Sequence, residues 1–351
     1  MSPRSHRPSR RGKRSAERPV SRTVDPLRYA SVYHAPVMAA EVLEGLVWAP
    51  DGLYVDATLG GGGHSEAILA ATAPLGRVIG IDQDADALEA AADRLEDAAQ
   101  EGRFSVLKGN FRDLGRLLKE AGVDQVDGIL LDLGVSSHQI DEASRGFAFR
   151  ADGPLDMRMN ASTGETAEGL IDRLDVQALT DLLRVYGEEP RAWPVANAIV
   201  QSRPLKTTSA LAAAVRSAVP VKEEVKTLAR VFQALRIAVN DEVGALEQVL
   251  KASLEALRVG GRLAVISYHS LEDRRVKRFM KFGNLEGIPE KDFYGNLHTP
   301  WTTITRKPVT ATDVEVAANP RARSARLRIA QKKPRTSSRD SGSREGAGPS
   351  P

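Results

Sequence analysis

The segment Leu53–His64 constrains the fold more than any other part of the sequence. It reads Leu-Tyr-Val-Asp-Ala-Thr-Leu-Gly-Gly-Gly-Gly-His, an apolar stretch that ends in four consecutive glycines. The apolar stretch predicts a short buried strand, and the apolar spacing in Ser65–Ala73 predicts a helix directly after the glycines. Bare glycine backbone can approach a ligand closely, and the N–H groups at a helix N-terminus are free to bind it. We therefore expect a ligand-binding turn between this strand and this helix.

A carboxylate at the end of the next predicted strand narrows the kind of ligand. That strand, Arg77–Asp82, ends in an acidic side chain that is placed to accept hydrogen bonds from ribose hydroxyls. The turn lacks the dinucleotide fingerprint, because Ser65 stands where the third glycine would be, and no Walker lysine follows. S-adenosylmethionine has a ribose and an amino-acid tail but no pyrophosphate. These features therefore favour S-adenosylmethionine as the cofactor.

Alternating strands and helices predict a doubly wound α/β fold around this site. Further strands are expected at Phe104–Leu107 and Val126–Val135, with the ligand at the carboxyl ends of the strands. The alternation stops at Ser136 and resumes with a strand at Gly260–Ser267. Helices are expected in the interval, at 178–186, 190–201, 208–218 and 223–237. An insertion that leaves the carboxyl edge of the sheet would overhang the cofactor, where a substrate-binding lid belongs.

Two outer elements complete the predicted fold. A helix is expected to begin near Pro36, since proline suits a first helical turn. Its apolar side would consist of Val37, Ala40, Leu43 and Val47. The segment Ser324–Ala330 alternates with period two, which predicts a late, half-buried strand.

Charge is divided unevenly between the ends and the centre of the chain. Residues 1–30 carry a net +7 and residues 331–351 a net +3, which leaves −7 on residues 31–330 out of a total of +3. Both ends are rich in Ser, Pro, Gly and Arg, so we expect disordered tails that act as phosphate-contacting arms or as solubilising extensions. The absence of cysteine excludes disulfides, zinc–thiolate sites and a cysteine nucleophile. No apolar run is long enough for a membrane span, so a soluble protein is expected.

The sequence thus predicts five parts. They are a disordered basic tail (1–30), the first part of an α/β domain (31–140), an inserted helical substrate-recognition domain (141–237), the second part of the α/β domain (238–330) and a second disordered basic tail (331–351).

Three side chains near the predicted cofactor each have two interpretations. Asp132 ends the fourth strand, where it contacts the cofactor or a target amine, or else caps a turn. Phe111 follows the third strand, where it packs on an adenine ring or within the core. His64 follows the glycines, where it contacts the carboxylate of the cofactor's methionine or serves as an ordinary turn residue.

Two later segments also carry polar side chains that are candidates for function. Arg145–Met159 mixes Phe and Met with Asp and Arg, so it either stacks bases and holds phosphate or forms a packed loop with internal ion pairs. In the segment Ser267–Arg278, His269 with Glu272 or Asp273 forms an acid–base pair or caps the following basic helix. No His, Asp or Glu spacing is specific enough to predict a metal.

With these segments in order, the chain resembles the bacterial 16S ribosomal RNA cytosine-N4 methyltransferase family of the MraW type. The matching segments within residues 32–330 are Tyr33–Met38, Gly60–His64, Gly128–Ser137, Arg145–Met159, Tyr186–Glu189, Phe232–Asn240, Ser267–Phe279 and Asn319–Ser324. The tails fall outside the resemblance. Asn284–His298 is short for the family, and His138 stands where the family has a proline before Gln139.

The resemblance implies a Rossmann-like class I S-adenosylmethionine-dependent methyltransferase with an inserted helical domain. It implies methyl transfer to N4 of a cytosine in the decoding region of 16S rRNA, in the small ribosomal subunit and in the cytoplasm. The cofactor contacts that it implies are Gly62, Gly63, His64, Asp82, Phe111, Asp132 and Gln139. As a separate hypothesis, the polar and loop-borne residues Asp156, Arg158 and His269 line the base pocket. The sequence identifies no proton acceptor.

Two other functional classes share some of these features. A nicotinamide-dependent oxidoreductase would have the same sheet and Asp82, but this chain lacks the third glycine of that class. A non-catalytic RNA-binding or ribosome-assembly factor would use the same tails and insertion without needing the cofactor turn. The sequence does not distinguish free RNA from an assembled subunit as the substrate, or a monomer from a homodimer.

Overall fold

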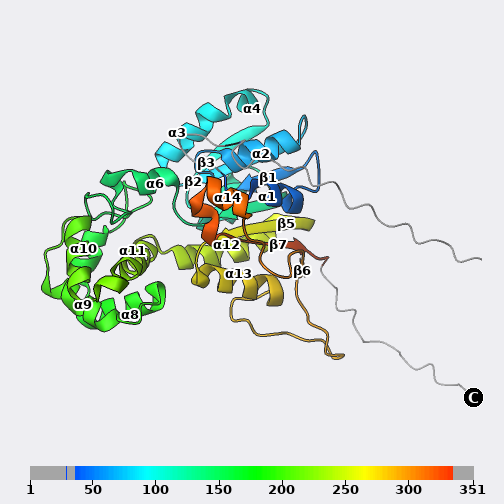
Figure 1. The fold of residues 1–351 in the computed structure, drawn as a ribbon. Coiled ribbons are helices and arrows are strands. Elements are labelled where there is room, and N and C mark those ends of the chain that lie inside the picture. The colour runs from blue at the N-terminus through cyan, green and yellow to red at the C-terminus, as the bar shows by residue number, and fades with distance from the viewer. Residues whose placement is uncertain (1–28, 30–35, 335–351) are drawn as a thin grey trace, which may run out of the picture.

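The computed structural model describes Tyr29 and residues 36–334 (Figure 1). Most of the two predicted basic tails, and the first residues of Tyr33–Met38, lie outside the described residues. The predicted start of the second tail needs a correction, because β7 (Arg326–Lys332) continues two residues beyond position 330. Those two residues pair with β6 (Trp301–Thr303), so the sheet extends further than the sequence predicts.

Seven strands form one sheet in the order β3-β2-β1-β4-β5-β7-β6. β1 to β5 run parallel to one another, and β7 lies between β5 and β6 and is antiparallel to both. The other strand bounds are β1 Leu53–Asp56, β2 Arg77–Asp82, β3 Phe104–Lys108, β4 Val126–Asp132 and β5 Leu257–Ser267. The sheet confirms the predicted Rossmann-like fold. Its strand order reverses between β1 and β4, and ligands of such sheets bind at the carboxyl ends beside this point.

Helices cover both faces of the sheet. Ile129 and Leu131 of β4 join a core with α5, α12 and α13, whereas Leu130 joins the opposite core with α1, α2 and α3. Successive strand residues point to opposite faces, so a strand covered on both sides is apolar throughout. These helices are α1 Ala39–Leu46, α2 Gly63–Ala71, α3 Ala85–Arg94, α4 Glu96–Gln100, α5 Leu114–Glu120, α12 Glu242–Ala256 and α13 Ser270–Phe282.

The helices between β4 and α12 form a lobe beside the sheet, which is the predicted insertion (Figure 1). They are α6 Ser137–Asp141, α7 Ala167–Arg173, α8 Val176–Gly187, α9 Ala192–Gln201, α10 Thr208–Ser217 and α11 Glu224–Asn240. Helices α7 to α11 share a buried apolar core of their own, to which the preceding loop adds Leu155 and Met157. Short 3-10 helices and one late helix complete the fold: η1 Phe111–Asp113, η2 Ala143–Arg145, η3 Val221–Glu223, α14 Asp313–Ala318 and η4 Pro320–Ser324.

Two local predictions are wrong. Helix α1 begins at Ala39 and not near Pro36, because Met38 adopts a left-handed backbone conformation with φ 57°. Its buried residues are therefore Ala39, Val42 and Leu46, while the predicted Ala40 and Leu43 are only partly buried. Strand β7 is not half-buried. Its four central residues are all buried, because β7 lies inside the sheet with cores on both faces.

Candidate functional site

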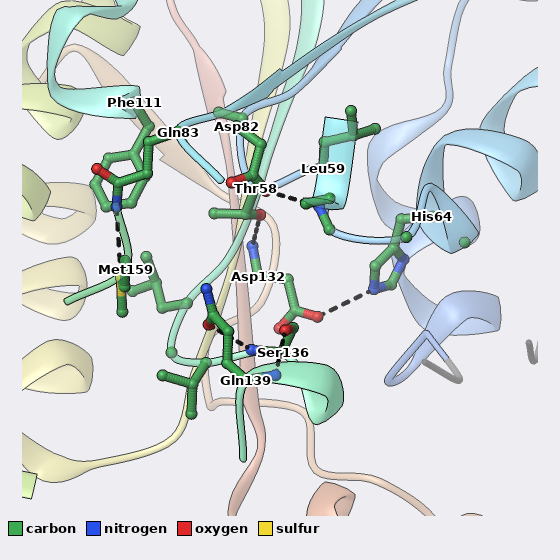
Figure 2. A pocket seen from close by; sticks show the side chains of 18 of the residues that line it. Thr58, Leu59, His64, Asp82, Gln83, Phe111, Asp132, Ser136, Gln139 and Met159 are labelled. Carbon is green, nitrogen blue, oxygen red and sulfur yellow. Dashed lines mark hydrogen bonds and ion pairs between the residues drawn. The ribbon is translucent and has the colours of Figure 1, made fainter. Parts of the chain in front are cut away.

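A cavity of about 880 Å³, counted with its open mouth, lies at the carboxyl ends of β1, β2 and β4 (Figure 2). Its wall includes Thr58, Gly60, Gly61, Gly63, His64, Asp82, Gln83, Asn110, Phe111, Asp132, Ser136, Gln139, Met159 and Tyr268. Six of the seven residues predicted to contact the cofactor are in this wall, and Gly62 is not. The structure thus brings most of the predicted cofactor residues together at the predicted edge of the sheet.

Asp82 fastens the glycine turn and faces the cavity. Its Oδ2 accepts a hydrogen bond from the Gly60 N–H at 2.9 Å, and its Oδ1 accepts one from the Asp84 N–H at 2.9 Å. Burial raises the pKa of Asp82 to about 6, although these two hydrogen bonds act in the opposite direction. Each carboxylate oxygen has a second lone pair, so Asp82 retains capacity to accept hydrogen bonds from a ligand.

Gly62 shapes the turn from behind the cavity. Its φ of 76° is in the left-handed region, and its N–H donates to the Leu59 carbonyl at 2.9 Å. A side chain on Gly62 would point at Ala91 and Leu95. Gly63 differs, because it lies in the cavity wall and a Cβ there would be 3.0 Å from the Pro36 ring.

The Asp132 carboxylate is held from two sides at the end of β4 (Figure 2). Tyr268 Oη donates a hydrogen bond to its Oδ1 at 2.8 Å, and His64 Nε2 lies 3.5 Å from its Oδ2. The Asp132 backbone N–H donates to Thr58 Oγ1 at 2.6 Å. Tyr268 and His64 therefore hold the carboxylate in the cavity wall, and Thr58 holds the backbone of the same residue.

His64 lies in a cluster of carboxylates. Its side chain is only 6% exposed, and burial alone would favour the neutral imidazole. The nearby carboxylates of Asp132, Asp56 and Glu315 outweigh that effect and raise the pKa of His64. Asp56 is itself fully buried, which raises its pKa, and it accepts a hydrogen bond from Ser65 Oγ at 2.9 Å.

Phe111 has the predicted place in the core and also lies in the cavity wall, where an adenine contact stays a prediction. It packs against the core beside α5 and α12, and it also lines the cavity. Next to it, Asn110 Nδ2 donates to Gln83 Oε1 at 2.9 Å, and Gln83 Nε2 contacts Met159 Sδ at 3.5 Å. This end of the cavity offers an aromatic ring and a thioether beside amide groups, which suits a flat heteroaromatic ring with polar edges.

Gln139 is in the cavity wall, but its side-chain amide is already used by the protein. Its Oε1 accepts from the Ser136 N–H at 3.1 Å, and its Nε2 donates to Asp84 Oδ2 at 2.8 Å. Ser136 Oγ in turn accepts from the Gln139 N–H, so α6 begins with a complete capping box. Gln139 therefore fixes the start of α6 against α3.

The three residues predicted for the base pocket lie outside this wall. Asp156 and Arg158 form a two-pronged ion pair with contacts of 2.7 and 2.8 Å, which is the internal pairing of a packed loop. His269 Nε2 lies 3.0 Å from Glu272 Oε1. Asp273, the other partner considered for His269, forms a buried pair with Arg328 instead, at 2.7 and 3.1 Å.

Five polar residues of the wall are not among those predicted from the sequence, namely Thr58, Gln83, Asn110, Ser136 and Tyr268. All of them except Ser136 follow the end of a strand by one or two residues. That position is itself a signal, because side chains just past the carboxyl ends of parallel strands gather at one edge. Their partners are not readable from the sequence, since each depends on which strand lies alongside.

One group within the described part of the chain has side chains close enough to bind a metal ion together, namely Glu242, His269 and Glu272. The Arg236 guanidinium already pairs with Glu242 through contacts of 2.7 and 2.8 Å. His269 and Arg236 also lower the pKa of Glu272, against the effect of its burial. These charges are matched within the protein.

Among the described residues, no helix is both long and apolar enough to span a membrane.

The residues present fit a cofactor that has a ribose, a flat ring and a charged tail. Asp82 supplies acceptors, Phe111 supplies an aromatic face, and the Gly60–Gly63 backbone leaves the wall open beside His64. His64 adds a buried basic side chain to this wall, and nearby carboxylates raise its pKa against the effect of burial.

Known proteins are similar to this chain over most of its length. The family model described as the MraW methylase family matches residues 31–333. A protein of Porphyromonas gingivalis named ribosomal RNA small subunit methyltransferase H is 50% identical over 311 residues, covering 86% of this chain and 97% of its own length. A protein of the same name from Parabacteroides distasonis is 47% identical over 306 residues, covering 86% and 98%. Among solved structures, Aeropyrum pernix fibrillarin with natively bound S-adenosyl-L-methionine is 11% identical, with a TM-score of 0.36 and coverage of 84% and 73%.

Proposed function

Because the chain belongs to the MraW methylase family, we propose that it transfers a methyl group from S-adenosylmethionine to N4 of a cytosine in the decoding region of 16S rRNA. The name shared by its relatives supports the methylation of small-subunit ribosomal RNA. The choice of N4 follows from the family resemblance of the sequence and from one observation, the Asp132 carboxylate held in the cavity wall. The reaction would take place in the cytoplasm, where small ribosomal subunits are available.

The cavity residues divide the work of holding the cofactor. S-adenosylmethionine, when bound, supplies a methyl group on a sulfonium whose leaving group is already good. Asp82 would accept hydrogen bonds from the ribose hydroxyls, Phe111 would pack on the adenine, and His64 would hold the carboxylate of the amino-acid tail, since all three residues line the cavity. Gly63 brings bare backbone into the cavity wall against the Pro36 ring, whereas Gly62 and Gln139 act by shaping the turn and α6.

Asp132 is proposed to make the target amine a better nucleophile. The N4 lone pair of cytosine is conjugated with the ring, so the free amine is a poor nucleophile. A carboxylate that accepts a hydrogen bond from one N–H of this amine localises the lone pair on N4. Most of the remaining rate enhancement comes from holding the amine close and aligned for in-line displacement. The target base must be unpaired or turned out of its helix to reach this position.

The insertion and its preceding loop are proposed to hold the RNA around the target base. Asp156, Arg158 and His269 lie outside the cavity wall, so their proposed role is contact with the nucleotides beside the target. Loss of RNA turnover in their alanine variants, with unchanged cofactor affinity, is the expected result. Wild-type turnover in all three would exclude that role.

The tails are proposed to supply phosphate contacts. The basic face predicted on α13 is partly neutralised, because Arg274 pairs with Glu188 and Arg275 with Glu247 at 2.8 Å. The centre of the chain has a net charge of −7, whereas the two ends together carry +10. Truncation of both tails should therefore weaken subunit binding and reduce its dependence on salt. An unchanged salt dependence would assign the contacts to the folded part.

A methyl-transfer assay tests the proposed function directly. Purified protein and labelled S-adenosylmethionine are combined with small ribosomal subunits from cells that lack the enzyme, and the modified nucleoside is identified by mass. The expected product is N4-methylated cytidine, lost in Asp82→Ala. Another methylated atom would keep the reaction class and reject the choice of N4. No product with either free RNA or subunits, despite cofactor binding, would favour a non-catalytic binding factor.

A further inference from the structure

We propose that Tyr268 is a positioning residue that, together with His64, aims the Asp132 carboxylate at the target amine. This inference rests on the proposed function, because it concerns the carboxylate that would accept a hydrogen bond from N4. It says which group each of the two carboxylate oxygens contacts. Tyr268 and His64 come from different elements and meet at Asp132, and all three side chains line the cavity. No feature of the local sequence around Asp132 points to either partner.

Sheet pairing brings Tyr268 to Asp132. Asp132 ends β4, and its register partner on the neighbouring β5 is Ile266, two residues before Tyr268. The tyrosine hydroxyl then reaches Oδ1 at 2.8 Å, a good distance for a hydrogen bond to a carboxylate. Gly134, with φ 107°, lies beside the ring, where a Cβ would be in ordinary van der Waals contact with Tyr268 Cδ2 at 3.5 Å.

Tyr268 serves as a permanent donor and not as the proton acceptor. Burial and the neighbouring carboxylates Asp132, Glu272 and Glu315 raise the pKa of Tyr268 well above 10. The phenol therefore remains protonated throughout the working pH range. A group that is never a phenolate cannot take the amine proton, so its contribution is to donate to Oδ1 and fix the carboxylate plane.

The second oxygen of Asp132 is the one left for the substrate. His64 Nε2 is 3.5 Å from Oδ2, which is too long for a strong hydrogen bond but close enough for attraction between charges. Oδ2 therefore retains lone pairs for the N4–H. The geometry gives Oδ1 to Tyr268 and Oδ2 to the amine, with His64 stabilising the negative charge from the side.

Charged groups from four elements surround Asp132. Asp56 of β1 and Glu315 of α14 repel the Asp132 charge, Glu272 of α13 lies beyond Tyr268, and His64 of α2 attracts it. The Tyr268 hydroxyl is a neutral donor, so it holds the carboxylate among these groups without adding a charge of its own. Removing that hydroxyl should therefore leave the carboxylate less firmly oriented toward the amine and lower kcat.

Tyr268→Phe is the decisive variant, since it removes the hydroxyl and keeps the ring. We expect kcat to fall about 10-fold or more, with the Kd for S-adenosylmethionine and the KM for subunits within about twofold of wild type. In an Asp132→Asn background the same change should have little further effect, because Tyr268 acts through that carboxylate. Thermal melts and cofactor binding verify that each variant is folded.

The outcomes separate this inference from the proposed function. Wild-type protein that methylates cytosine N4, together with a Tyr268→Phe variant of unchanged kcat, overturns the inference alone. Equal losses from Tyr268→Phe with and without Asp132→Asn also overturn it, because Tyr268 would then act independently. Wild-type protein that methylates no base, or a different atom, overturns the proposed function and this inference with it.

Discussion

Arg145 and Asp84 form a buried ion pair, with 3.0 Å between Nη1 and Oδ2, that ties the loop after α6 to the start of α3. The Nη2 atom of the same guanidinium donates to the carbonyls of Arg158 and Met159, at 3.2 and 2.9 Å. Met159 lies in the cavity wall. One side chain thus links the cofactor cavity to the loop that leads into the helical insertion.

Arg145→Ala should therefore weaken both stability and cofactor binding. The change removes the positive partner of the buried Asp84 carboxylate, which keeps only its hydrogen bonds from Gln139 and the Asp86 N–H, and it leaves two carbonyls without this donor. Breaking a buried pair in this way costs about 3 kcal/mol. Urea unfolding would measure the loss of stability, and calorimetry with S-adenosylmethionine the loss of affinity. Arg173→Ala is a suitable control, because its pair with Glu165 is exposed at the surface and should contribute little. Equal unfolding midpoints for the two variants would contradict the role given to Arg145.

Gly146 and Gly164 allow a matched test of packing within the same loop region. Both have positive φ, 72° and 87°, so an alanine at either site carries similar backbone strain of about 1 kcal/mol. A Cβ on Gly146 would lie 2.2 Å from the Pro154 carbonyl oxygen, whereas one on Gly164 would meet nothing within 4 Å. Gly146→Ala should lower the melting temperature by clearly more than Gly164→Ala. Equal melting temperatures would show that the loop relaxes freely around Gly146.

The Asp273 carboxylate on α13 is expected to stabilise the fold and not to bind the cofactor. It forms a two-pronged pair with Arg328 in which both side chains are 10% exposed, and this pair joins α13 to β7. Asp273→Asn should destabilise the protein by about 3 kcal/mol in urea unfolding, because Arg328 keeps a buried charge without its partner. Cofactor affinity should remain unchanged, since neither residue lines the cavity. A loss of affinity without a loss of stability would contradict this assignment.

The parts of the fold that the sequence predicted are those whose signals are local. Each parallel strand is a short apolar run, and Asp82 and Asp132 are recognisable because they stand at strand ends. The helical insertion is likewise visible, since strand patterns are missing over a long interval. These features depend on neighbours in the chain, and the structure has them near the predicted positions.

What the sequence did not predict depends on contacts between distant segments. Tyr268 reaches Asp132 because β5 pairs with β4, although 136 residues separate the two side chains. Asp273 turns toward Arg328 and away from His269 because β7 inserts into the sheet beside β5. The apolar face of α1 was misplaced because Met38 has a left-handed backbone conformation that no apolar spacing reveals. In each case tertiary packing selected among partners that the local sequence leaves equivalent.

The raised pKa of Asp82 predicts an acid-sensitive cofactor site. The ionised carboxylate accepts hydrogen bonds from the ribose hydroxyls, and its pKa of about 6 lies above the ordinary value of 3.8. Protonation therefore begins as the pH falls toward 6, and one oxygen then becomes a donor. Below about pH 6 the Kd for an adenosyl ligand should rise by up to about tenfold per pH unit. Calorimetric titrations between pH 5 and 8 would measure this change.

A second ligand distinguishes the effect of Asp82 on binding from that of His64, which also lines the cavity. Methylthioadenosine has the ribose and adenine but no carboxylate, so the state of His64 should affect its binding little. Its Kd should still rise on the acid side of about pH 6 in the wild-type protein. Asp82→Asn should bind it weakly at pH 8 and with little change down to pH 5, because an amide does not titrate there. If the wild-type affinity for methylthioadenosine stays constant across this pH range, Asp82 does not contact the ribose. Any acid sensitivity of S-adenosylmethionine binding would then come from the charged tail of that cofactor.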